Sequence, residues 1–164
     1  MRPLFFAPRE TMLGEPTTRE AAMLRNLFAI IAGLFAMMIV VTFIQLANIK
    51  FFYPPPPGLD FTNPEVIAAY VPTMPWQATA IVVASELLAA FVGAFAAASI
   101  SRDHKLACAL AIGAIDMALV AMNAISIPHP TWAIVAGIGL PLPLAWLAAR
   151  LSARVAQKGL ASTR

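Results

Sequence analysis

The chain has 164 residues, of which 60% are hydrophobic and 12% charged, and its formal net charge at pH 7 is +3. Soluble globular domains carry about 25% charged residues, so this composition excludes an ordinary soluble domain and is typical of a membrane protein. The basic residues are spread along the chain beside apolar segments rather than gathered in one patch, which argues against nucleic acid as a partner.

Four long apolar segments follow one another along the chain. At ~1.5 Å per residue, about 20 residues span the ~30 Å hydrocarbon core of a bilayer. The sequence therefore predicts an all-α integral membrane protein, a four-helix bundle built of antiparallel hairpins. The predicted helices are about 27–47, 78–100, 106–127 and 132–149.

Lysine and arginine are distributed unevenly between the segments that connect these helices. They occur in the predicted tails 1–26 and 150–164 and in the turn between the second and third helices, which leaves Lys50 as the only one of the 11 on the other side. The positive-inside rule then predicts a bacterial inner (plasma) membrane protein with cytoplasmic N- and C-termini and a periplasmic loop of about 48–77.

Two local patterns outside the apolar segments predict helix starts. Thr17 and Glu20 have capping-box spacing, so we expect a helix to begin there and to continue into the first crossing. In the long loop, a run of prolines predicts a stiff polyproline II rod that ends at Gly58. Asn63 as N-cap and Pro64 as the first helical residue then predict a short amphipathic helix, which lies on the bilayer surface or caps the bundle.

The most informative residues for function are two acids inside the apolar segments, Glu86 and Asp116. Each lies about ten residues from the outer end of its helix, which places both near the middle of the bilayer. Because the two helices are neighbours in a hairpin, we expect the side chains to meet. The second helix also carries a face of small residues suited to close packing, namely Ala89, Ala90, Gly93 and Ala97.

Two interpretations of the acid pair stay open. No Lys or Arg occurs at the depth of Glu86 and Asp116, so we expect at least one acid to be protonated and the pair to share a proton. In the first interpretation, the pair acts as a proton relay or as a site for cation-coupled transport. In the second, it only forms hydrogen bonds between helices. Gln45, Thr42 and Asn123 extend a polar path from the acids, or satisfy one another.

The remaining motifs predict local structure rather than chemistry. Pro141 and Pro143 predict a kink in the fourth helix, which frees carbonyl groups near Gly137 and Gly139 for an ion or for packing. The single cysteine, Cys108, is expected to be a small buried residue. No nucleophile set, metal-ligand spacing or nucleotide motif is present in the sequence, so we expect no metal, no cofactor and no enzymatic activity.

Several short motifs carry a resemblance to a known family. They are Tyr53–Gly58 with Asp60, Pro75-Trp76, the turn Pro128–Trp132 and Pro141-Leu142-Pro143. The chain in these regions resembles a family of small four-helix bacterial inner-membrane proteins of unknown function. The resemblance implies a fold and a location but no activity and no catalytic residue. Four-helix multidrug exporters differ, because their essential glutamate lies in the first crossing.

Three classes of function follow from these observations. The favoured one is a non-enzymatic bundle that acts as an accessory or oligomerising membrane subunit, with the lipid bilayer, further copies of the chain or a larger membrane complex as partners. The alternative is a small proton-coupled transporter or channel that uses Glu86 and Asp116. An intramembrane lipid-modifying enzyme, with the acids as general acid and base, is the third.

Overall fold

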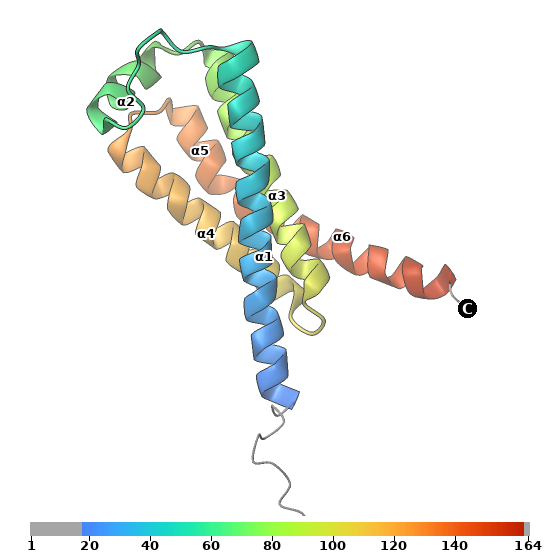
Figure 1. The fold of residues 1–164 in the computed structure, drawn as a ribbon. Helices are drawn as coiled ribbons and strands as arrows, with labels where there is room; N and C mark the ends of the chain where they lie inside the picture. The colour runs from blue at the N-terminus through green and yellow to red at the C-terminus, as the bar shows by residue number, and fades with distance from the viewer. Residues whose placement is uncertain (1–17, 163–164) are drawn as a thin grey trace, which may run out of the picture.

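The computed structural model describes residues 18–162, and this part of the chain is helical apart from its connecting segments (Figure 1). Four helical stretches within it are long and apolar enough to cross a membrane, as the sequence predicts: Arg19–Phe52, Trp76–Ile100, Lys105–Ser126 and Thr131–Gly159. The elements in chain order are α1 (Thr18–Ala47), the π-helical turn η1 (Asn48–Phe52), α2 (Pro64–Tyr70), the 3-10 turn η2 (Val71–Thr73), α3 (Trp76–Ile100), α4 (Lys105–Ser126), α5 (Thr131–Gly139) and α6 (Pro141–Ser162).

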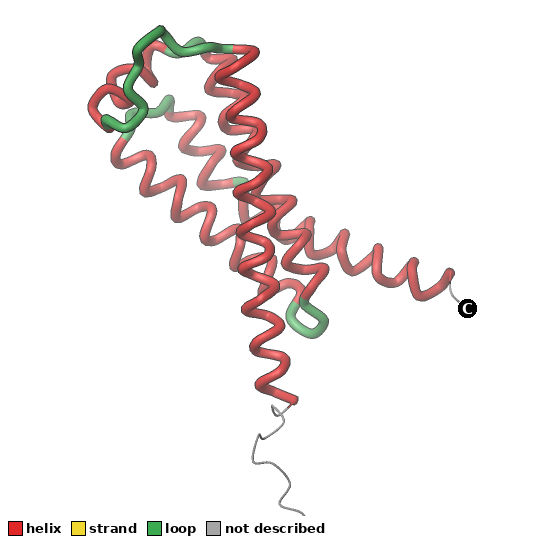
Figure 2. Tube along the Cα trace, viewed as in Figure 1, coloured by secondary structure: helices red, strands yellow, loops and turns green. Residues whose placement is uncertain are grey.

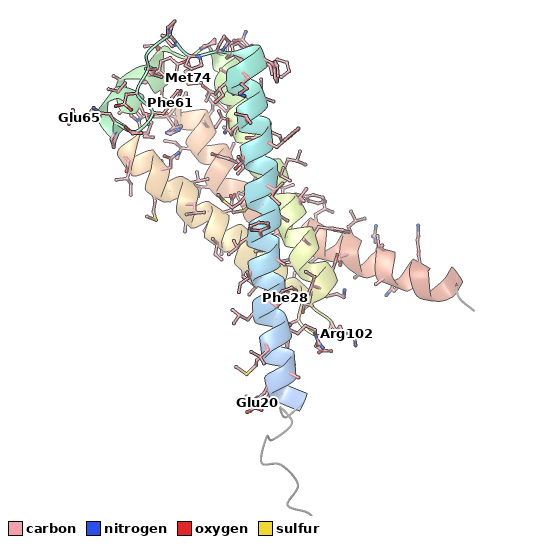
Figure 3. All side chains as sticks on the ribbon, in the orientation of Figure 1. Glu20, Phe28, Phe61, Glu65, Met74 and Arg102 are labelled. Carbon is pink, nitrogen blue, oxygen red and sulfur yellow. The ribbon has the colours of Figure 1, made fainter. Side chains whose placement is uncertain are left out.

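The helix α1 begins well before the predicted crossing and exposes most of its apolar surface. It starts at Thr18 and continues into the apolar segment that begins near residue 27, as the spacing of Thr17 and Glu20 predicts, while Thr17 itself lies outside the described residues. Phe28 projects outward from α1 in Figure 3 and is 62% exposed. Large exposed side chains continue along the helix and give it an apolar outer face, made of Leu24, Phe28, Ile31, Phe35, Ile39 and Phe43.

A glycine pair brings α1 and α3 into close contact. A Cβ atom built on Gly33 would lie 2.7 Å from the carbonyl oxygen of Gly93, and a Cβ on Gly93 would lie 2.7 Å from the carbonyl oxygen of Gly33. Ile112 of α4 is fully buried against both glycines. The small-residue face predicted for α3 is confirmed, because Ala89, Ala90, Gly93 and Ala97 are all buried.

The short turn between α3 and α4 is tied to the N-terminal part of α1. The hydroxyl of Ser101 donates to Asn26 Oδ1 at 2.9 Å and accepts from the backbone N–H of His104 at 3.2 Å. Arg25 forms an ion pair with Asp103. These contacts hold the turn, which carries Arg102 at the same end of the molecule as the start of α1 (Figure 3).

The fourth apolar segment consists of two helices, α5 and α6, separated at Leu140 (Figure 2). The sequence predicted one helix kinked by Pro141 and Pro143, whereas both prolines stand in the first turn of a new helix. A missing N–H is harmless there, because the first N–H groups of a helix have no intrahelical partner. The helix α6 then continues to Ser162, far beyond the predicted crossing, and its end extends away from the other helices (Figure 1).

The connection from η1 to α3 is shaped by local hydrogen bonds. Gly58 has a φ of +83°, in a turn closed by the bond from Leu59 N–H to the carbonyl of Pro56 at 3.3 Å. The predicted cap of α2 is confirmed, since Asn63 Oδ1 accepts from the backbone N–H of Glu65 at 3.0 Å. Figure 3 places Glu65 and Phe61 on the part of the molecule formed by α2 and its preceding loop.

An Asx-type turn precedes α2. Asp60 Oδ1 accepts from the backbone N–H of Thr62 at 2.8 Å and from its hydroxyl at 2.6 Å. The hydroxyl and backbone hydrogen bonds from Thr62 hold the pKa of Asp60 below its usual value, because they favour the charged carboxylate.

Candidate functional site

The two acids lie on neighbouring helices and line one cavity. Glu86 of α3 and Asp116 of α4 are both part of the lining of a cavity of about 230 Å³, which α1 completes with Met37, Met38 and Val41. Helical spacing explains the placement. Glu86 lies one turn before the buried Ala89 and Ala90, so it emerges close to the face that α3 packs against α1.

Asp116 is buried in the lining of this cavity and has an unpartnered carboxyl oxygen. Its side chain is only 6% exposed, and its Oδ2 atom has no hydrogen-bond partner. A buried polar atom without a partner costs about 1–3 kcal/mol. A hydrogen bond from Glu86 to Oδ2 would remove that cost, and the structure does not form one. The Oδ2 atom of Asp116 is therefore a free acceptor at the cavity, and the sharing of a proton with Glu86 stays a prediction.

The cavity has an acidic floor and an apolar mouth. Asp116, with Met37 and Ala89 buried beside it, forms the floor. Met38 of α1 is 54% exposed and Leu119 of α4 is 49% exposed, so the cavity opens at the surface between these two helices. In Figure 1, α4 diverges from α1 toward the end of the molecule that carries α2. An entering molecule would pass apolar side chains and then meet the carboxyl groups.

A second and smaller cavity, of about 20 Å³, lies on the other side of Glu86. Besides apolar side chains, its lining includes Thr79, Asn123 and His129. A volume of about 10–15 Å³ already accommodates a water molecule when polar partners are present. The imidazole of His129 is positioned by a hydrogen bond of 2.7 Å between Nδ1 and the carbonyl of Ile127. Glu86 thus has polar side chains on the path toward the α4–α5 turn.

Asn123, predicted as part of a polar path, lines both cavities. Sequence reasoning did not place Thr79 and His129 on this path. The position of Thr79 could have been predicted from helical spacing, because it stands seven residues, or two helical turns, before Glu86 and therefore lies on the same face of α3. No sequence pattern predicts the position of His129, because that position depends on the conformation of the α4–α5 turn.

The other predicted polar residues do not reach the acids. Thr42 is exposed and lines a shallow apolar depression on the outer side of α1, and Gln45 is half-buried but lines neither of the two cavities beside Glu86. Asn48, at the start of η1, was not predicted as a site residue. It is 1% exposed, its Oδ1 atom has no hydrogen-bond partner, and η1 contacts α3.

The described part of the chain offers no group of three or more His, Cys, Asp or Glu residues suited to a metal ion. Cys108 is buried, as expected. No family model matches the chain, and no curated protein or solved structure is significantly similar to it. The resemblance to small four-helix inner-membrane proteins stays a prediction.

Proposed function

We propose that this protein is a small proton-coupled membrane carrier in which Glu86 and Asp116 bind protons and a cationic solute alternately. The observation that carries the proposal is the buried, unpartnered Oδ2 atom of Asp116 on the floor of a cavity that opens between α1 and α4. Acids that serve only as hydrogen-bonding groups between helices would be expected to satisfy each other, and this atom is unsatisfied.

The lining of the cavity selects the class of solute. Met38, Val41 and Leu119 present apolar surface near the mouth, while the floor presents carboxyl groups. A cation with an apolar body matches both, because it buries its body against these side chains and neutralises a carboxylate inside an apolar environment. Binding of a monovalent cation displaces one proton from the acid pair, so the charge inside the cavity stays constant in the exchange.

The proposal includes a topology. The four crossings form an antiparallel bundle in the bacterial inner membrane with both termini in the cytoplasm, and the cavity mouth faces the lipid between α1 and α4. The distribution of Lys and Arg supports this orientation. A lateral mouth suits a solute with an apolar body, which is concentrated in the bilayer.

Binding of tetraphenylphosphonium, a permanent cation with an apolar body, tests the site in detergent. The purified protein should bind this probe and release protons into a weakly buffered solution, and binding should weaken as the pH falls, because protons compete for the carboxyl groups. Asp116→Asn and Glu86→Gln should each weaken binding by about tenfold or more, ~1.4 kcal/mol. Glu65→Gln is the matched control, since it removes a carboxylate from the exposed helix α2.

Proteoliposomes then test whether proton movement is coupled to movement of the cation. A gradient of the same cation should drive proton movement, reported by a pH-sensitive dye, with the native chain and with Glu65→Gln but not with Glu86→Gln. Cation binding that is unaffected by both cavity substitutions, or proton movement that persists in Glu86→Gln, would contradict the proposal.

One observation favours a second function, that of an accessory or oligomerising subunit without enzymatic activity. The outer face of α1 presents large apolar side chains, Phe28, Phe35 and Phe43 among them, that no other element covers. Such a face fits a neighbouring transmembrane helix as well as lipid. Purification in mild detergent tests it: a stoichiometric partner or a defined oligomer that Phe35→Ala dissociates would support this function.

A further inference from the structure

The C-terminal part of α6, residues 150–162, differs from the rest of the helices in its exposure and charge. We refer to it as the α6 extension. Ser152 is buried, and all residues from Arg154 to Gly159 are exposed. Figure 1 shows the extension running away from the other helices, on the side of the molecule where α3 ends.

The α6 extension carries a basic stripe beside an apolar stripe. Arg150, Arg154 and Lys158 follow one another at intervals of four residues, so they lie along one side of the helix. Leu151 and Val155 have the same spacing one position later, and they are 42% and 54% exposed. A helix with adjacent basic and apolar stripes is suited to the boundary between lipid headgroups and acyl chains.

The positive charge of the extension is not balanced within its own part of the chain. No Asp or Glu follows Asp116 in the sequence, so α5 and α6 contain only basic charges. In the nearby α3–α4 turn, the carboxylate of Asp103 is already paired with Arg25. Within α3 to α6 no free carboxylate outside the acid-lined cavity is left to neutralise the stripe, so it can accept an anion from another molecule.

A groove between α4 and α6 extends the basic surface toward the membrane-spanning helices. The groove measures about 370 Å³, and its lining includes Lys105 of α4 together with Trp146 and Arg150 of α6. The guanidinium carbon of Arg150 lies 4.3 Å from the centroid of the Trp146 ring. Trp146 is 44% exposed, as is typical of a tryptophan at the level of the headgroups.

We propose that the α6 extension and this groove bind an anionic glycerophospholipid. The lipid phosphate accepts hydrogen bonds from the basic stripe, and one acyl chain packs into the groove beside Trp146. Leu151 and Val155 lie on the other side of the stripe, where the second acyl chain of the same lipid packs. The charge of the stripe, its apolar neighbour and the position of Trp146 together fit a charged headgroup attached to an apolar chain. This inference is independent of the acid-lined cavity.

Trp146 provides a built-in reporter. In a chain with Trp76→Phe and Trp132→Phe, Trp146 is the only tryptophan, and lipids with brominated acyl chains quench its fluorescence in detergent. Brominated phosphatidylglycerol should quench at lower concentration than brominated phosphatidylcholine. In the same background, Arg154→Gln with Lys158→Gln should reduce this preference by about fivefold for each cation removed. The matched control, Arg19→Gln with Arg102→Gln, removes the same charge from other exposed positions and should keep the preference.

Three results would overturn the proposal. The first is equal quenching by the two lipids, and the second is a loss of preference in the control as large as in the α6 variant. The third is abolition of the preference by inorganic phosphate at the concentration of the lipid, which would indicate a site for free anions. A salt titration tests the proposal without any substitution in the basic stripe. The preference for phosphatidylglycerol should decrease as ionic strength rises, because the basic side chains are exposed. A preference that is independent of salt would refute the proposal.

Discussion

The glycine pair between α1 and α3 allows a sharp test of how these helices are held together. In Gly33→Ala, the new Cβ atom would lie 2.7 Å from the carbonyl oxygen of Gly93 and 2.9 Å from the Cβ atom of Ala97. Close contacts between carbon and a carbonyl oxygen across helices are about 3.3 Å or longer. The helices must therefore separate by roughly 0.6 Å, because the carbonyl oxygen of Gly93 belongs to the backbone and cannot avoid the clash by a change of rotamer.

The expected loss in the free energy of unfolding of Gly33→Ala follows from two opposing effects. Overfilling a packed contact costs about 1–3 kcal/mol, and alanine regains about 0.5–1 kcal/mol over glycine within a helix. Because the clash is with backbone, we expect the upper part of the range and a net loss of about 2 kcal/mol. Gly33→Ala with Gly93→Ala should cost less than the sum of the single changes, since one separation of the helices accommodates both methyl groups.

Unfolding by sodium dodecyl sulfate in mixed micelles, followed by circular dichroism and tryptophan fluorescence, measures this loss. Gly139→Ala is the control, because no heavy atom outside its immediate neighbours lies within 4 Å of the position of its Cβ atom. Its free energy of unfolding should stay within about 0.5 kcal/mol of the native value. If Gly33→Ala and Gly139→Ala were equally stable, the close contact of α1 with α3 would be refuted.

Two further predictions concern the topology and the long loop. After replacement of Cys108, an impermeant thiol reagent applied to intact spheroplasts should label Thr62→Cys and not Ser162→Cys, and the opposite pattern would invert the proposed orientation. Gly58→Ala should destabilise the protein by about 1–2 kcal/mol, because a residue with a Cβ atom is strained at a φ of +83°, although no atom lies within 4 Å of the new methyl group. Thermal melting in detergent measures the effect, and an unchanged melting temperature would show that the turn is not maintained.

The sequence predicts the four apolar helices well because hydropathy and length are local properties. It does not predict where the helices end, because hydropathy reports where apolar residues stop. Arg150 and Lys158 end the apolar pattern of the last crossing, yet both residue types are good helix formers and α6 continues through them. The start of α1 at Thr18, before its apolar segment, is predicted by a different signal, the capping-box spacing of Thr17 and Glu20.

The positions of Glu86 and Asp116 along their helices could be predicted, whereas the rotation of α1 could not. The helix α1 is apolar on all sides, so no periodic pattern distinguishes the face that meets α3. The structure shows that Ala29, Gly33 and Met37, spaced by four residues, form this face. Thr42 stands five residues after Met37, about 140° around the helix at ~100° per residue, and therefore faces away from the acids.

The cavity could not be predicted either, because it depends on how three helices diverge. Ile112 of α4 is buried against Gly33 and Gly93, and Gly113 brings α4 close to Pro141 and Ala145 of α6. These contacts form a close-packed layer. Asp116 stands one turn beyond Ile112, on the side toward α2, where α4 separates from α1 (Figure 1). The carboxyl group therefore lies where close packing ends and the open cavity begins.

This arrangement gives the glycine layer a role in the proposed carrier. In the observed conformation the layer closes the path from Asp116 toward the α3–α4 turn, while the cavity stays open between α1 and α4. A carrier must also expose its site to the other side, and here that requires α1, α3 and α4 to separate at the layer and to close beside Met38 and Leu119. The contact of Gly33 with Gly93 is between backbones, but Ile112 and Ala97 are buried around it, so separation of the helices at this layer would uncover apolar side chains. Opening this layer in the proposed carrier therefore has a free-energy cost, which binding of the cation or of a proton must offset.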